Sequence, residues 1–125
     1  MNKKAVPVGV ENFERIIKDG YYYVDKSLLI EKMLENRTPV TLFTRPRRFG
    51  KTLNMSMLKY FFDIENKEEN RKLFENLKIS DSKYMSEQGK YPVIFISLKD
   101  LKADTWKDCF VLIKKHNTYK TQVCQ

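Results

Sequence analysis

Three consecutive residues, Gly50, Lys51 and Thr52, carry the group types that bind a phosphate chain. In a P-loop, backbone N–H groups at the N-terminus of a helix converge on phosphate oxygens. A lysine ammonium reaches the outer phosphates, and a serine or threonine hydroxyl helps to hold Mg²⁺. The tripeptide alone is short enough to occur by chance, so the elements around it must support this interpretation.

The residues that precede the tripeptide are strongly basic. Arg45, Arg47, Arg48 and Lys51 place four positive charges within seven residues. Two unit charges about 6 Å apart repel by about 0.7 kcal/mol even in water. A bound polyphosphate would relieve this repulsion, whereas a solvated basic turn is the alternative interpretation.

The segments on either side of the basic loop are those that a P-loop requires. Val40 to Thr44 is short, apolar and β-branched, and lies between Pro39 and Pro46, which predicts a buried strand. Lys51 to Phe62 follows directly and predicts a helix. The apolar face of that helix comprises Leu53, Met57, Leu58 and Phe61. Arg45 replaces the first glycine of the GxxxxGK[ST] pattern, so the motif is a degenerate Walker A sequence.

Apolar residues recur at helical spacing in further segments, each of which predicts an amphipathic helix. These segments are Glu11 to Asp19, Leu28 to Leu34, Glu68 to Leu77 and Trp106 to Lys115. Asp25 is placed to cap the second of these helices. The apolar run from Val93 to Leu98, after Pro92, predicts a second buried strand.

Composition limits the classes of function. A formal charge of +8 favours polyanionic partners such as nucleotides or nucleic acid. The two cysteines form no CxxC pair, so we expect neither a disulfide framework nor a protein-bound metal. Residues 1–20 contain no apolar core of a secretion signal, and no stretch approaches the roughly 18 apolar residues of a membrane span. We therefore expect a cytoplasmic protein that does not interact with membranes.

Together these motifs resemble the bacterial and archaeal AAA-ATPase-like family. YYYVDKSLLIEKML at 21–34 and LFTRPRRFGKTLNMSMLKYFF at 42–62 look like its two N-terminal motifs. The similarity continues through YPVIFISLKDLKADTWKDCF at 91–110 and fades after about Lys115. The family pattern itself carries arginine at the position of Arg45, so the departure from the Walker A formula looks like a family feature.

The resemblance implies ATP and Mg²⁺ binding by an α/β fold, a P-loop NTPase-like three-layer α/β/α domain of which this chain would be the N-terminal part. It places Lys51 on the β- and γ-phosphates, Thr52 toward Mg²⁺ and the backbone N–H groups around Gly50 on phosphate oxygens. The three arginines of the loop would contact the phosphates. The expected nucleotide-binding residues are therefore Arg45, Pro46, Arg47, Arg48, Phe49, Gly50, Lys51 and Thr52.

Longer relatives also carry a downstream strand that ends in acidic residues, and often a nuclease-like domain of the PD-(D/E)XK type. Asp100 follows an apolar run here, but residues 97–99 separate it from that run, which is poor geometry for a Walker B carboxylate. Hydrolysis would then lack a group that positions water, so we expect ATP binding and leave ATPase activity open. We expect residues 1–115 to form the N-terminal part of the domain and 116–125 a divergent tail, truncated or disordered.

Two other interpretations fit the same residues. One is a basic nucleic-acid-binding module that uses Arg45, Arg47 and Arg48 on phosphates and the tyrosines at 21–23 for stacking on bases. The other is an inactive remnant that binds no nucleotide. Binding of Mg·ATP that depends on Lys51 would separate the nucleotide-binding interpretation from both.

Overall fold

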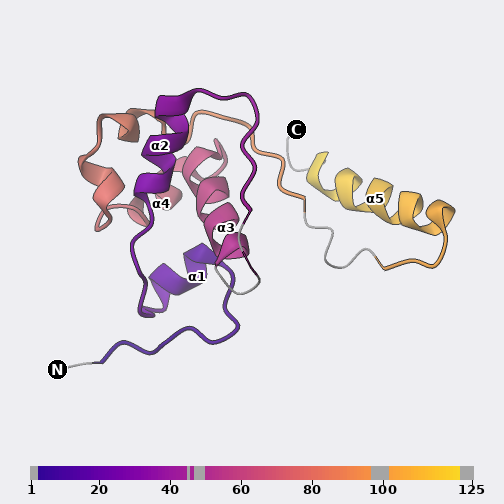
Figure 1. Cartoon of the computed structure of the whole chain (residues 1–125), viewed down its shortest axis with the longest axis horizontal. Coiled ribbons are helices and arrows are strands. Elements are labelled where there is room, and N and C mark those ends of the chain that lie inside the picture. The colour runs from indigo at the N-terminus through magenta and orange to yellow at the C-terminus, as the bar shows by residue number, and fades with distance from the viewer. Residues whose placement is uncertain (1–2, 45, 47–49, 97–101, 122–125) are drawn as a thin grey trace. The chain divides into compact units, whose positions relative to one another are not determined.

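The computed structural model describes residues 3–44, 46, 50–96 and 102–121, which form helices joined by extended segments and turns (Figure 1). The chain divides into two compact units, residues 1–93 and 94–125. The described α-helices are α1 (Phe13–Lys18), α2 (Leu28–Asn36), α3 (Lys51–Phe62), α4 (Lys67–Lys72) and α5 (Trp106–Thr121), and the 3₁₀ helices are η1 (Lys78–Asp81) and η2 (Lys83–Glu87).

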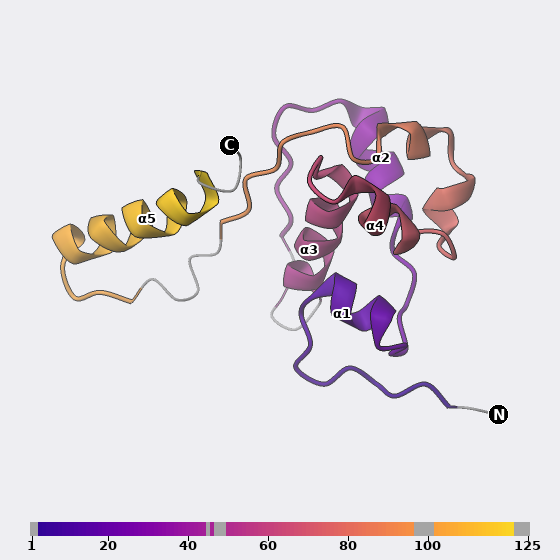
Figure 2. The ribbon, with the colours of Figure 1, turned by 180° about the vertical axis from the view of Figure 1, so that it is seen from behind.

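Aromatic side chains form the centre of the first unit. Phe13, Phe61 and Phe74 are fully buried, and the Phe74 ring lies 5.0 Å from that of Phe13 and 5.3 Å from that of Phe61. Such pairs add about 0.5–1.5 kcal/mol each beyond the burial of their area. Because these rings come from α1, α3 and the turn after α4, they join segments far apart in the sequence. Figure 2 shows α1 beside the beginning of α3.

The predicted three-layer α/β/α fold is wrong, since the described residues contain no β-strand. The run from Val40 to Thr44 has no regular secondary structure, and Val40 and Leu42 are 83% and 81% exposed. The described part of the second predicted strand is not a strand either, and its Ile94 is 79% exposed. One isolated parallel bridge joins Asp63 to Tyr91. An apolar run becomes a strand only when a neighbouring strand satisfies its backbone groups, and among the described residues neither run forms a ladder.

The predicted helices are present; α3 has the predicted limits, and the limits of the other helices differ from those predicted. The face predicted for α3 is confirmed, since Met57, Leu58 and Phe61 are buried. In α2 the fully buried residue is Ile30, which the predicted stripe did not include. α4 ends at Lys72 rather than Leu77, because tighter i→i−3 hydrogen bonds replace helical ones over the following residues and turn Leu73 and Phe74 into the core.

The second unit is built on α5. The Thr105 hydroxyl donates to the Asp108 carboxylate (2.8 Å) and accepts the Asp108 N–H (3.3 Å), a capping arrangement at the start of the helix. Trp106 is 73% exposed and stacks on Phe110, with ring centroids 5.9 Å apart. No helix among the described residues is both long enough and apolar enough to cross a lipid bilayer.

Candidate phosphate-binding site

The N-terminus of α3 begins at the glycine of the predicted motif. Gly50 is the N-cap residue and adopts the left-handed conformation (φ 75°, ψ 23°), which glycine tolerates without strain. Its carbonyl accepts the Asn54 N–H at 2.9 Å, the first i→i−4 bond of the helix. The N–H groups of Lys51, Thr52 and Leu53 precede that bond, so their donors belong to the set that a helix N-terminus offers to an anion.

The charges in the first turn of α3 oppose the helix dipole. This turn contains Lys51 and no acidic residue, and both Lys51 and Thr52 are exposed. A cation at the positive end of a helix is unfavourable, typically by about 0.3–1 kcal/mol. An anion bound there would interact favourably with both the dipole and the ammonium group.

The structure brings part of the predicted site together. Gly50, Lys51 and Thr52 are consecutive at the start of α3, and Pro46 is exposed in the preceding segment. The other predicted nucleotide-binding residues, Arg45, Arg47, Arg48 and Phe49, lie outside the described residues. Their contacts with phosphate stay predictions.

A cleft of about 490 Å³ lies against the start of α3. We call it the lysine-lined cleft, because its described lining contains Lys26, Lys32 and Lys51. The remaining described lining residues are Leu28, Leu29, Phe43 and Asn54. Its size lies within the range of small-ligand sites in proteins.

A second cleft, of about 380 Å³, shares two lining residues with the first, Lys26 and Asn54. We call it the apolar cleft, since most of its described lining is apolar or aromatic. This lining includes Val6, Pro7, Ile16, Tyr22, Tyr23, Val24 and Leu53, together with Gly50. The start of α3 therefore contributes to both clefts.

The segment before α2 is held by a set of hydrogen bonds around Asp25. Its carboxylate accepts the Ser27 N–H (2.9 Å), the Ser27 hydroxyl (2.6 Å) and the Lys78 N–H (2.8 Å). The fully buried Ser27 hydroxyl also accepts the Ile79 N–H (3.2 Å). Burial alone would raise the pKa of Asp25, but the bonds from Ser27 and Lys78 outweigh it and lower that pKa. The cap predicted at Asp25 is wrong, because α2 starts at Leu28 and its N-cap residue is Ser27, which makes no side-chain cap bond. Asp25 instead holds the turn before α2 and ties that turn to η1.

The tyrosines of the same segment have different environments. The Tyr23 hydroxyl donates to the Met57 sulfur (3.3 Å), and its ring packs edge-on to Phe13, with centroids 5.6 Å apart. Burial raises the pKa of Tyr23 to about 12. Tyr22 is 56% exposed, and its N–H donates to the Ala5 carbonyl at 2.8 Å. Tyr23 therefore belongs to the core, while Tyr22 joins the N-terminal segment to the wall of the apolar cleft.

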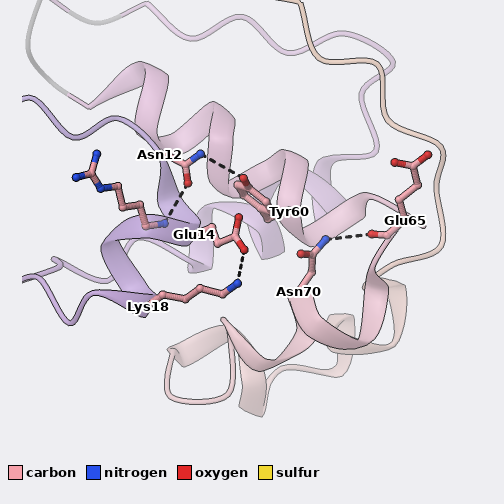
Figure 3. A network of polar contacts seen from close by, with 7 residues as sticks. Asn12, Glu14, Lys18, Tyr60, Glu65 and Asn70 are labelled. Carbon is pink, nitrogen blue, oxygen red and sulfur yellow. Dashed lines mark hydrogen bonds and ion pairs between the residues drawn. The ribbon is translucent and has the colours of Figure 1, made fainter. Parts of the chain in front are cut away.

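Polar contacts fix α1 against α3 (Figure 3). The Asn12 side chain caps α1 by accepting the Arg15 N–H (3.0 Å) and donates to the Tyr60 hydroxyl (3.2 Å). On the same helix, the Lys18 ammonium pairs with Glu14 and lowers the pKa of that carboxyl. The Phe13 N–H also donates to the buried Ser56 hydroxyl (3.1 Å). α1 is thus a rigid support for the helix whose first turn meets both clefts.

Sequence reasoning missed Lys26 and Lys32 as residues of this region. Both are separated from Gly50 by many residues, and nothing in their own spacing marks them as neighbours of the loop. The sequence offered only an indirect indication: both lysines lie in the 21–34 motif, which the family resemblance includes together with the basic loop. Only the folded chain places Lys26 and Lys32 in the lining of the cleft that contains Lys51.

Comparison with known proteins gives a family match and one curated relative. The sequence model of the family described as "Predicted AAA-ATPase" matches residues 7–124. An "Uncharacterized protein in vnfD 5'region" from Azotobacter chroococcum mcd 1 is 37% identical over 98 residues. That alignment covers 78% of this chain and 17% of the relative, so the chain spans a minor part of the relative's length. No solved structure matches.

Proposed function

The chain belongs to the predicted AAA-ATPase family, and from this premise we propose that it binds ATP with Mg²⁺ through the segment from Arg45 to Thr52. Membership suggests nucleotide binding in general. The choice of ATP, of this segment and of the roles of its residues is our proposal. Lys51 contacts the β- and γ-phosphates, and Arg45, Arg47 and Arg48 contact the phosphate chain from the loop.

The observation that carries the proposal is the beginning of α3. A left-handed Gly50 is followed at once by a helix of 12 residues whose first turn holds Lys51 and lacks an acidic side chain. Phosphate-binding loops use this combination because the glycine lets the backbone turn its N–H groups toward the anion. The exposed lysine adds a charge-assisted contact.

The side chains present also fit a metal ion that arrives with the nucleotide. Mg²⁺ in nucleotide sites is held largely by phosphate oxygens and water, with one or two protein ligands. The Thr52 hydroxyl, exposed in the first turn of α3, is suited to be such a ligand. In the part of the chain that the structure describes, no group of three or more His, Cys, Asp or Glu side chains could hold a metal by itself. Bound Mg²⁺ would neutralise phosphate charge beside Lys51.

The test is calorimetric titration with Mg·ATP at about 0.15 M salt, where the Debye length of about 8 Å screens unspecific attraction to the +8 chain. Lys51→Ala is compared with Lys72→Ala, which removes the same charge from an exposed position on α4. We expect Lys51→Ala to weaken binding at least tenfold, the lower end for a hydrogen bond to a charged group. Lys72→Ala should bind like the wild type.

Equal binding by the two variants, or no binding by the wild type, would overturn the proposal. Salt-sensitive binding of single-stranded DNA or RNA that Mg·ATP does not displace would instead favour the basic nucleic-acid-binding interpretation. Each protein is checked by circular dichroism, so that a loss of binding is not confused with a loss of fold.

A further inference from the structure

We propose that Lys26, together with Lys32, binds the phosphate chain of the nucleotide in the lysine-lined cleft. This inference rests on the proposed function and extends it, because it adds two residues that lie outside the P-loop segment. It also assigns a role to the YYYVDKS segment: that segment presents a second phosphate-binding lysine.

The described lining of the cleft is positively charged and contains no acidic residue. Its three ammonium groups come from the segment before α2 (Lys26), from α2 itself (Lys32) and from the first turn of α3 (Lys51). None of the described residues that line the cleft is a carboxylate. Three like charges around one concavity favour a ligand with several negative charges close together.

The three lysines are available to a ligand. Within the described residues, no ion pair joins Lys26, Lys32 or Lys51 to an acidic side chain. Asp25 is the nearest carboxylate in sequence to Lys26, but its two oxygens accept three hydrogen bonds from Ser27 and Lys78. These bonds keep the carboxylate with η1, and the ammonium of Lys26 remains exposed in the clefts.

The backbone on both sides of Lys26 is fixed. Asp25 before it is bonded to the Lys78 N–H, and the fully buried Ser27 after it is bonded to the Ile79 N–H. A ligand therefore does not have to order the main chain that carries Lys26, which lowers the entropic cost of binding. Lys26 also lines the apolar cleft, so it belongs to the lining of both clefts.

The shape of the site favours the phosphate chain of a small molecule. A cleft of about 490 Å³ is the size of a small-ligand site. Leu28, Leu29 and Phe43 give the cleft an apolar part beside its lysines. Because the charged groups in the described lining are all cationic, affinity should rise with the number of phosphates.

The test uses inorganic tripolyphosphate, which carries the charges of ATP without base or ribose, and Mg·ATP in parallel. Lys26→Gln and Lys32→Gln remove one charge each while keeping most of the side-chain length, and Lys72→Gln is the matched control on α4. Titrations at about 0.15 M salt should show at least fivefold weaker binding of tripolyphosphate by each cleft variant, the loss expected for one close ion pair in water. The double variant should lose more than either single variant, and the control should match the wild type.

The outcomes separate this inference from the proposed function. If Lys51→Ala abolishes binding while Lys26→Gln and Lys32→Gln bind both ligands like Lys72→Gln, the inference is overturned and the proposed function stands. If the cleft variants lose tripolyphosphate while Lys51→Ala retains Mg·ATP, the proposed function fails and the cleft is an anion site of its own. Because both replaced lysines are exposed, circular dichroism and melting temperature should match the wild type; variants that unfold would contradict the structural basis of the inference.

Discussion

Asp25 offers the sharpest test of how the segment before α2 is held. In Asp25→Asn, Oδ1 and Oδ2 become one amide oxygen and one NH₂ group. The carboxylate accepts two bonds from Ser27 and one from the Lys78 N–H. One of these donors would then face an NH₂ donor, and the remaining bonds would lose their charge assistance.

The size of the effect follows from the number of bonds and from their exposure. A hydrogen bond to a charged acceptor contributes about 1.5–3 kcal/mol and a neutral one about 0.5–1.5 kcal/mol, a difference of about 1 kcal/mol for each of the three bonds. Asp25 is only partly buried, so solvent reduces this sum. We expect Asp25→Asn to lower the free energy of unfolding by about 1–2 kcal/mol. For a unit of this size, that loss corresponds to a fall in Tm of roughly 4–16 °C.

The assay is thermal and urea denaturation at pH 7, with Asp19→Asn as the control. Asp19 loses the same charge, but its pair with Arg15 (3.4 Å) has partners that are 65% and 50% exposed, so the change should stay within about 0.5 kcal/mol. The pKa of Asp25 is lowered from 3.8, so its contribution is complete above about pH 4 and is lost as pH falls through the folded-state pKa. The gap between wild type and Asp25→Asn should therefore shrink as pH falls from 5 toward 2. Equal stability of the two variants at pH 7, or a gap that does not shrink in acid, would refute the reasoning.

Two further predictions concern the core and a turn. The pKa of Tyr23 is raised from 10.0 to about 12, so the folded state favours the neutral phenol, and stability should fall as pH rises from about 10 to 12. Tyr23→Phe should show a smaller fall over the same pH range in thermal melts, and an equal fall would contradict the burial of that hydroxyl. A Cβ at Gly89 (φ 70°) would lie 2.5 Å from Lys67 Cβ, whereas one at Gly20 (φ 69°) would meet nothing within 4 Å. Gly20→Ala should lower the free energy of unfolding by about 1–2 kcal/mol through backbone strain. Gly89→Ala should lower it by about 1–3 kcal/mol more, because the new methyl group overpacks against Lys67. Equal urea midpoints of the two variants would show that Lys67 does not pack against residue 89.

The helices of the first unit were largely readable from the sequence, because helical periodicity is a local property. The apolar residues of α3 recur on one face, and that face is the one buried. The helix also begins at Lys51, where the glycine of the motif ends the loop. The predicted end of α4 was wrong, because a turn after Lys72 places Leu73 and Phe74 in the core.

The absence of strands at the described parts of the two apolar runs could not be predicted from local sequence in the same way. Val40 to Thr44 has the composition of a buried strand, yet its pairing depends on another segment that must supply hydrogen bonds along its whole length. In the described residues, Val40 and Leu42 stay exposed and no ladder forms. The buried strand predicted from this composition is therefore wrong.

By itself, the sequence determined that Gly50, Lys51 and Thr52 open a helix, because the glycine and the apolar spacing after it act over a few residues. It did not determine which residues share the cleft with Lys51. The tertiary structure decided that, since hydrogen bonds from residues 78 and 79 to Asp25 and Ser27 fix the segment that carries Lys26. These contacts span more than fifty residues of chain, and only packing of the whole unit around its buried phenylalanines brings such groups within bonding distance.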